Sequence, residues 1–276
     1  MIKTLMVQGT ASHVGKTILA SGICRSLLKE GLKVCPFKPQ NITSNIIALP
    51  NDEVISYAQC LQAKACNILP DARMNPVAIS VVGKNVDFII RGKVIHHGSF
   101  SDYYKLLPIM KEAIIDSYLS LSKHYDCIVV EGAGSPVEIN RLGDDISNMW
   151  FANYFQIPVI LVGNMEYGGG FASIAGTFEL LERSSFSLIK GFAFNKYDGN
   201  KELLNKGIKY IESRYGKKFL GALPYIEKLN IPEEDTLYPA NNLTNANQYG
   251  YLDLSYSFER LAHYISKNID LNFINI

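Results

Sequence analysis

The sequence lacks the features that mark membrane-spanning and secreted proteins. None of its apolar runs approaches the roughly 20 residues that span a bilayer, and a glycine-rich turn stands where a signal peptide would have its apolar core. The five cysteines form no C-x-x-C pair, and an odd number of scattered cysteines is typical of reduced thiols. We therefore expect a cytoplasmic protein that contacts no membrane.

The sequence also lacks an excess of charge. Its 27 Lys and Arg residues nearly balance 26 Asp and Glu residues, the formal net charge is +1, and no long run of one sign occurs. Proteins that bind nucleic acid electrostatically usually carry a basic patch or a positive excess, so we expect no nucleic-acid partner. With 276 residues, 47% of them hydrophobic, the chain suits one large α/β domain or two small ones.

Short apolar segments alternate with longer amphipathic ones along the chain. This alternation predicts a doubly wound α/β fold with a mostly parallel sheet. No domain boundary stands out, so we expect a single domain over 1–276, in which 227–276 forms an irregular connection and a closing helix. Strands are expected at 4–9, 33–39, 126–130, 157–164, 188–198 and 218–226. Helices are expected at 15–31, 53–67, 104–125 and 256–268, and a hairpin over 87–95.

The loop after the first strand has the character of a phosphate-binding loop. It reads GTASHVGKT from Gly9 to Thr17, and Thr10 stands where the spacing G-x-x-x-x-G-K-[ST] has its first glycine. Backbone N–H groups at a helix start suit phosphate oxygens, Lys16 adds positive charge, and the Thr17 hydroxyl suits Mg²⁺. Placed between a strand and a helix, the motif favours a nucleotide site over a plain tight turn. The expected nucleotide contacts are Gly9, Thr10, Ser12, His13, Val14, Gly15, Lys16 and Thr17.

Polar residues also follow three other predicted strands. Ligands of an open parallel sheet bind beyond the carboxyl ends of its strands, so these residues are expected near the same site. Glu131 suits a Mg²⁺ ligand facing the phosphates. The alternative is an ordinary acid before a turn, and the phosphate loop favours the functional interpretation. Lys38 follows the second predicted strand, and a lysine at the end of a strand is usually solvated rather than functional. Asn195 opens the tetrapeptide N-K-Y-D, which suits recognition of a purine edge but is common by chance.

The sequence offers no obvious nucleophile. It contains no G-x-S-x-G or G-x-C-x-G elbow, and its five histidines form no ligand cluster. Lysines, Mg²⁺ ligands and phosphates remain, and these residue types indicate phosphoryl transfer by positioning and charge neutralisation.

Longer stretches of the sequence resemble a known family. The loop GTASHVGKT resembles that of dethiobiotin synthetase and its relatives, whose glycine is likewise displaced by one residue, which implies a P-loop NTPase fold of that type. Within this superfamily the closer likeness is to the cobyric acid synthase family, in order over about the first 225 residues. The matching stretches include PFKPQN (36–41), PDARMNP (70–76), EGAGSPVEIN (131–140), DISNM (145–149), KGFAFNKYDG (190–199) and LGALPY (220–225).

This resemblance implies an ATP-dependent amide ligase of cobalamin biosynthesis. Enzymes of the cobyric acid synthase family amidate four side-chain carboxylates of adenosylcobyrinic acid a,c-diamide at the expense of ATP and glutamine. Each carboxylate is phosphorylated by ATP, and ammonia then attacks the acyl phosphate. The implied cofactors are ATP and Mg²⁺. The implied partners are a corrinoid substrate and ammonia or a separate glutaminase, and a homodimer is left open.

The resemblance also assigns roles to residues. Lys38 matches an active-site lysine of dethiobiotin synthetase and would neutralise the transferring phosphoryl group, while Asn195 would contact adenine. The implied catalytic residues are Lys16, Lys38 and Asp145, and the implied Mg²⁺ ligands are Thr17 and Glu131. The implied substrate contacts are Gln40, Asn41, Asn75, Ser135 and Asn148.

The chain departs from the family pattern in three places. Family members usually carry a second, glutaminase domain with a catalytic Cys, and this chain stops near where that domain would begin, so we expect no glutaminase here. The family's E-I-G-R-A-Q reads V-I-S-Y-A-Q, and its G-D-I-D-R-G-G reads G-N-M-E-Y-G-G. Tyr57 and Tyr167 thus replace two arginines, and the substrate differs from that of the family if those arginines contact carboxylates or phosphates.

Two other functions stay open. The first is a dethiobiotin synthetase-like carboxylase acting on a diamine. The stretches EGAGSPVEIN, DISNM and RMNP favour the amide ligase over this carboxylase. The second is an ATPase switch of the ParA/MinD type. Such switches carry an extra lysine early in the phosphate loop, where this chain has Ala11 and Ser12, so the switch ranks last.

Overall fold

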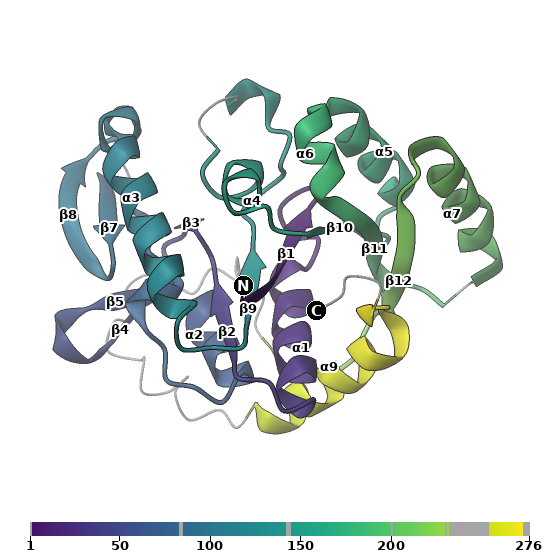
Figure 1. Cartoon of the computed structure of the whole chain (residues 1–276), viewed down its shortest axis with the longest axis horizontal. Coiled ribbons are helices and arrows are strands. Elements are labelled where there is room, and N and C mark those ends of the chain that lie inside the picture. The colour runs from purple at the N-terminus through teal and green to yellow at the C-terminus, as the bar shows by residue number, and fades with distance from the viewer. Residues whose placement is uncertain are drawn as a thin grey trace.

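The centre of the molecule is a six-stranded parallel sheet (Figure 1). The computed structural model describes residues 2–82, 85–141, 145–199, 201–229, 231 and 254–272. The strand order is β12-β11-β10-β1-β9-β2, and each neighbouring pair is parallel, which confirms the predicted fold class. The strands are β1 (Lys3–Gly9), β2 (Val34–Phe37), β9 (Cys127–Glu131), β10 (Val159–Asn164), β11 (Ile189–Tyr197) and β12 (Lys218–Pro224).

Helices cover both faces of this sheet, which explains why its strands are almost entirely apolar. Leu5 and Val7 of β1 pack in the hydrophobic cluster that includes α1 and α9, whereas Met6 packs in the cluster on the opposite face. On the first face lie α1 (Lys16–Lys29) and α9 (Ser255–Asn268). On the second lie α3 (Tyr103–Leu121), α4 (Met149–Phe155), α5 (Gly170–Leu180), α6 (Arg183–Leu188) and α7 (Lys201–Tyr215).

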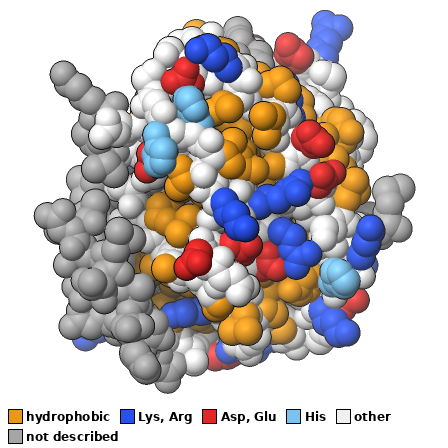
Figure 2. Space-filling view, turned by 90° about the vertical axis from the view of Figure 1, so that its left-hand side faces the viewer, with side chains coloured by type: hydrophobic (Ala, Val, Ile, Leu, Met, Phe, Trp, Pro, Cys, Tyr) orange, Lys and Arg blue, Asp and Glu red, His pale blue; other side chains and the backbone are white. Residues whose placement is uncertain are grey.

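A second, smaller sheet lies beside β2, on the left of Figure 1. Its order is β3-β6-β7-β8; β3 runs parallel to β6, and the other pairs are antiparallel. The hairpin predicted around Gly92 is confirmed as β7 and β8. On the side of the molecule shown in Figure 2, positive and negative side chains are interspersed with hydrophobic ones. The strands are β3 (Gln40–Ile42), β6 (Val77–Val82), β7 (Asn85–Ile90) and β8 (Lys93–Gly98).

The prediction of a helix over 53–67 is wrong for its first residues. Residues Val54–Ser56 form β5, which pairs with β4 (Ile46–Ala48), so the helix α2 spans only Tyr57–Ala65. The apolar residues of 53–67 have helical spacing, but β4 lies before this range, and pairing with β4 makes 54–56 a strand instead. Four 3₁₀ turns complete the described elements: η1 (Pro50–Asp52), η2 (Ala72–Met74), η3 (Phe100–Asp102) and η4 (Ile139–Arg141).

The C-terminal part of the chain is described only in places. The irregular connection expected over 227–250 lies almost wholly outside the described residues, whereas the closing helix is confirmed as α9. Among the helices that the structure describes, none combines the length and the apolar character needed to cross a membrane.

Candidate functional site

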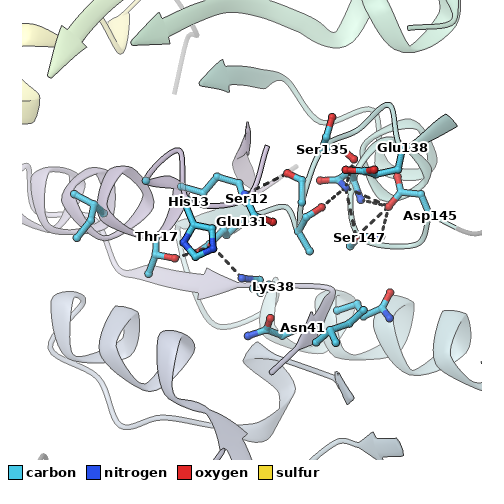
Figure 3. A pocket seen from close by; sticks show the side chains of 18 of the residues that line it. Ser12, His13, Thr17, Lys38, Asn41, Glu131, Ser135, Glu138, Asp145 and Ser147 are labelled. Carbon is cyan, nitrogen blue, oxygen red and sulfur yellow. Dashed lines mark hydrogen bonds and ion pairs between the residues drawn. The ribbon is translucent and has the colours of Figure 1, made fainter. Parts of the chain in front are cut away.

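A cavity of about 450 Å³ opens at the carboxyl ends of the parallel strands, where ligands of such sheets bind. Three segments and one residue of α3, Tyr103, line it. The segments are the loop between β1 and α1, the end of β9 with the segment that follows it, and the stretch from Lys38 to Ile42 that includes β3 (Figure 3). Most residues predicted from the sequence therefore meet at one site. Five of the predicted residues are not among those that line it: Gly9, Thr10, Val14, Asn75 and Asn195. Val14, Asn75 and Asn195 are buried behind its wall.

The loop between β1 and α1 has the geometry of an anion-binding turn. Gly15 has a φ of 89° and caps the N-terminus of α1, where unpaired backbone N–H groups attract phosphate oxygens. The Asn195 amide donates to the carbonyl of Val14 at 3.1 Å, and a Cβ on Gly15 would collide with the same amide. Asn195 therefore buttresses the phosphate loop from behind. Its predicted contact with adenine stays a prediction.

Lys16 lies across the mouth of the loop. Its ammonium group donates to the carbonyls of Ala11, at 2.9 Å, and Gly134, at 3.2 Å. One carbonyl belongs to the loop after β1 and the other to the segment after β9, and the Lys16 side chain that joins them is buried. The lysine thus holds a positive charge beside the loop that would receive the phosphates.

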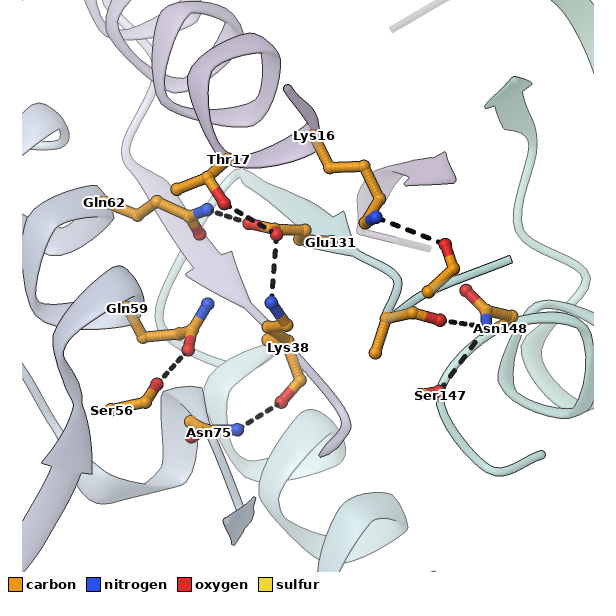
Figure 4. A network of polar contacts seen from close by, with 12 residues as sticks. Lys16, Thr17, Lys38, Ser56, Gln59, Gln62, Asn75, Glu131, Ser147 and Asn148 are labelled. Carbon is orange, nitrogen blue, oxygen red and sulfur yellow. Dashed lines mark hydrogen bonds and ion pairs between the residues drawn. The ribbon is translucent and has the colours of Figure 1, made fainter. Parts of the chain in front are cut away.

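Glu131 is the centre of a buried polar network (Figure 4). Its Oε1 accepts hydrogen bonds from the Thr17 hydroxyl, at 2.9 Å, and from the Lys38 ammonium group, at 3.0 Å. Its Oε2 accepts from the Gln62 amide. Because burial of an unpaired charge is costly, the four side chains depend on one another.

The spacing of the Thr17 and Glu131 oxygens is compatible with the predicted Mg²⁺ site. Mg²⁺ prefers oxygen ligands at about 2.1 Å in octahedral geometry, so adjacent ligand oxygens are about 3 Å apart. The Thr17 Oγ1 and Glu131 Oε1 atoms are 2.9 Å apart. Among the described residues no group of three or more His, Cys, Asp or Glu could hold a metal, and a Mg²⁺ site with one carboxylate usually takes its other ligands from phosphates and water.

Lys38 is only 1% exposed, unlike the solvated lysine that a strand end usually carries. Its backbone N–H donates to the carbonyl of Met74, and its own carbonyl accepts from the Asn75 amide at 3.0 Å. The Asn75 amide also donates to the carbonyl of Val77 at 3.1 Å. Asn75 thus fixes the backbone of Lys38 against β6. Because Asn75 is buried outside the cavity lining, the structure does not support its predicted contact with substrate.

Asp145 and Asn148 connect α4 to the cavity. The Asp145 carboxylate accepts from the backbone N–H groups of Ser147, Asn148 and Met149, each at 2.9 Å, and so caps the start of α4. Burial raises the pKa of the Asp145 carboxyl, and these hydrogen bonds oppose the rise. Asp145 lies at the cavity wall, which allows the predicted contact with substrate or ammonia. Its hydrogen bonds, however, indicate that the carboxylate positions the start of α4.

The Asn148 amide ties the segment after β9 in place. It donates to the carbonyl of Ala133 at 2.6 Å and to that of Ser135 at 3.3 Å. Ser135 lines the cavity beside these carbonyls, and its hydroxyl accepts from the backbone N–H of Val137. The two residues shape the wall that faces Lys38, and whether they touch substrate stays a prediction.

Sequence reasoning missed the contribution of α2. Gln62 holds Glu131, and the Gln59 amide oxygen accepts from the Ser56 hydroxyl close to the same network. Both glutamines are fully buried. Gln59 and Gln62 are three residues apart on α2 and share a helix face. Two glutamines on one face of a mostly buried helix were therefore a usable signal.

The two tyrosines at the family's arginine positions lie away from the cavity walls. Tyr57 begins α2 and is partly buried, and Tyr167 is 87% exposed after β10; neither is among the described residues that line the cavity. The departures from the family pattern therefore leave the walls of this cavity intact.

No cysteine is available as a nucleophile among the described residues. All five cysteines are buried and unpaired. Burial raises the pKa of Cys24, Cys35 and Cys60, and it raises that of Cys127 to about 12, so their reactive thiolates are scarce at neutral pH.

Comparisons with known proteins find relatives that match most of the chain. The family model of the CobQ/CobB/MinD/ParA nucleotide binding domain matches residues 5–238. The bifunctional adenosylcobalamin biosynthesis protein CobDQ of Leptospira interrogans is 46% identical over 235 residues, which are 85% of this chain and 27% of that protein. A cobyric acid synthase of Vibrio parahaemolyticus is 42% identical over 250 residues, 88% of this chain and 51% of that protein.

The chain therefore spans about half the length of this cobyric acid synthase and a smaller share of the bifunctional protein. Among solved structures, the signal recognition particle receptor FtsY of Elizabethkingia anophelis aligns with a TM-score of 0.48 and 14% identity, over 89% of this chain and 65% of that one. A similarity at that level supports no conclusion about function.

Proposed function

The chain belongs to the family of CobQ/CobB/MinD/ParA nucleotide-binding domains, and from this premise we propose that it is an ATP-dependent amide ligase acting on corrinoid carboxylates. The reaction is that of cobyric acid synthase, the conversion of adenosylcobyrinic acid a,c-diamide to cobyric acid. One observation carries the proposal: the phosphate loop with Lys16, the buried pair of Lys38 and Glu131, and the amides of β3 share one cavity.

In the proposed reaction, a substrate carboxylate oxygen attacks the γ-phosphorus of ATP. The bond from that phosphorus to the β–γ bridging oxygen breaks, and ADP leaves with the electron pair. Ammonia then attacks the carbonyl carbon of the acyl phosphate, the carbon–oxygen bond to phosphate breaks, and the nitrogen loses a proton. Phosphoryl transfer of this kind depends mainly on positioning and charge neutralisation.

The residues of the cavity suit these two tasks. Lys16 lies beside the phosphate loop, and Lys38 lies between that loop and β3, where a phosphoryl group passing to a substrate carboxylate would need positive charge. Thr17 and Glu131 would hold Mg²⁺. When bound, Mg²⁺ would neutralise charge on the phosphates of ATP.

Ammonia is the proposed nitrogen source, either free or released by a separate glutaminase. The buried, weakly acidic cysteines of the described residues support this assignment, since glutaminases of this kind use a reactive cysteine. We also propose that 1–276 acts as a single synthetase domain. The packing of α9 on α1 supports this, because it joins the closing helix to the core of the sheet.

Reduced, buried cysteines and the biosynthetic relatives support a cytoplasmic location. A homodimer stays an expectation.

The test measures ADP release by the purified chain with Mg-ATP. We expect release that requires both cobyrinic acid a,c-diamide and ammonium, and that rises with pH at fixed total ammonium because neutral NH₃ is the attacking species. A requirement for bicarbonate in place of ammonium would identify the carboxylase alternative. ATP hydrolysis indifferent to both additions would identify the ATPase switch, and glutamine-supported synthesis by the chain alone would contradict the nitrogen assignment.

A further inference from the structure

Two side-chain amides on β3 line the cavity with hydrogen-bond donors. Gln40 is 4% exposed and Asn41 is 3% exposed, and both belong to the cavity wall next to Lys38. The Nε2 of Gln40 and the Nδ2 of Asn41 have no acceptor among the described residues. Buried N–H groups without an acceptor are rare in folded proteins, and they commonly mark the place of a ligand.

The orientation of the Gln40 amide is fixed by a contact from α3. The Tyr103 hydroxyl donates to the Gln40 Oε1 at 3.1 Å. The acceptor end of this amide is therefore occupied, and the NH₂ end remains for a ligand. Figure 3 shows Asn41 on the same side of the cavity as Lys38, so the two amide groups and the ammonium group together make a wall of donors.

We propose that Gln40 and Asn41 form a subsite that binds the ionised carboxylate of the substrate and discriminates against the amide that the reaction makes. The inference rests on the proposed function and specifies how its substrate is chosen. A carboxylate offers only acceptor oxygens, whereas a carboxamide presents its own NH₂ donors. Bound here, a carboxamide would place its NH₂ group against a wall of donors, where it finds no acceptor, and polar sites reject that kind of mismatch strongly.

Such discrimination matters for a substrate that carries carboxylates and carboxamides on the same ring. An enzyme without it would be occupied by side chains already amidated. The donor wall places each remaining carboxylate beside Lys38 and lets the product leave, because amidation replaces one of the two acceptor oxygens with an NH₂ donor.

The first test compares Asn41→Asp and Gln40→Glu with wild type in ADP release. Each change replaces an NH₂ donor with an acceptor of the same shape. We expect the KM for cobyrinic acid a,c-diamide to rise by about tenfold to a hundredfold, and the Kd for Mg-ATP to change by less than about threefold. Inhibition by cobyric acid, the amide product, should stay the same or strengthen. Asn205→Asp, which adds the same charge on an exposed position of α7, is the matched control.

An unchanged KM, or an equal loss of affinity for the acid and the amide, would overturn the proposal. If the acidic variants do not fold, Tyr103→Phe replaces them. It removes only the hydroxyl that orients Gln40, and we expect a rise of several-fold in the KM for the corrinoid with no change in the Kd for Mg-ATP.

The second test separates this inference from the proposed function. The midpoint of thermal unfolding is measured in Mg-ADP with added propionate or propionamide, since a ligand that binds the native state raises the midpoint. We expect propionate to raise it more than propionamide, and Asn41→Asp to abolish the difference. This preference together with no turnover of the corrinoid would refute the proposed function and leave the subsite standing. No preference in wild type would refute the subsite itself.

Discussion

The two sides of the cavity, which we propose to bind phosphate and carboxylate, would recognise these groups by different means. The phosphate side, Gly9 to Thr17, is contiguous in sequence and depends on backbone geometry, as the φ of 89° at Gly15 shows. The carboxylate side, Lys38 to Asn41, depends on side chains whose partners are distant. Lys38 and Glu131 are 93 residues apart, and Gln40 and Tyr103 are 63 apart.

This difference predicts different sensitivities to substitution. Phosphates can be held by the N–H groups that every residue except proline carries. Apart from Lys16 and Thr17, the phosphate side should therefore tolerate changes of side chain but not of backbone conformation. A carboxylate next to amide groups needs donors of the right type in the right place, so the other side tolerates no change of hydrogen-bonding type. Lys16 and the Lys38–Glu131 pair join the two sides and should be most sensitive of all.

The largest effect is expected at Lys16. Lys16→Ala removes the charge that lies between the carbonyls of Ala11 and Gly134, and we expect ADP release to fall by on the order of a thousandfold or more. The unfolding midpoint should stay near that of wild type, because hydrogen bonds to two loop carbonyls contribute little to the packing of the core. An unchanged affinity for ATP in this variant would show that the loop is not a phosphate site.

The next effect concerns the buried pair. Glu131→Gln should lower turnover by on the order of a hundredfold or more, and it should also cost about 3 kcal/mol of unfolding free energy because Lys38 loses its buried partner. Urea unfolding and ADP release measure the two quantities separately.

The double variant Glu131→Gln with Lys38→Met is the matched control for this pair. With both charges removed, most of the stability should return while turnover stays low. Restored turnover in the double variant would show that the pair serves only the fold.

A smaller effect is expected at Gly15. Gly15→Ala forces a Cβ into the left-handed region and against the Asn195 amide, which costs about 1–2 kcal/mol from the backbone conformation alone. Affinity for ATP should fall about tenfold, while the preference for propionate over propionamide should persist. If both were lost together, the two sides of the cavity would not be independent.

The smallest effect is expected at Asp71, which supports the carboxylate side from outside. Its carboxylate accepts from the backbone N–H of Arg73 at the start of η2, and the η2 residue Met74 holds the backbone of Lys38. Burial alone would raise the pKa of Asp71, but hydrogen bonds and charge from Arg73 outweigh it and lower the pKa.

A lowered pKa in the folded state stabilises the protein above the unfolded pKa of about 3.9 and loses that contribution as the pH falls through the folded value. Asp71→Asn should therefore cost less than about 1 kcal/mol at pH 7 because the pair is partly exposed. Urea unfolding of both proteins should show the difference shrinking below about pH 4. A difference that grew on acidification would contradict the assigned pKa.

The two sides also differ in how well the sequence predicted them. The phosphate loop, the parallel strands and Glu131 follow from local patterns, because a strand, a glycine turn and a helix in succession determine where their own groups lie. The roles of Asn75 and Asp145 depend on contacts that no local pattern shows, namely the pairing of β3 with β6 and the capping of α4. Gln62 was missed because its partner lies 69 residues away.

The most direct test of the central claim follows an oxygen atom. The substrate is cobyrinic acid a,c-diamide with ¹⁸O in its carboxylates, incubated with Mg-ATP, ammonium and the purified chain, and the inorganic phosphate is analysed by mass spectrometry. If the cavity brings a carboxylate to the γ-phosphate, each amide formed sends one labelled oxygen into phosphate. Unlabelled phosphate, formed at the same rate as ADP, would show that water rather than the carboxylate attacks ATP and would contradict the account.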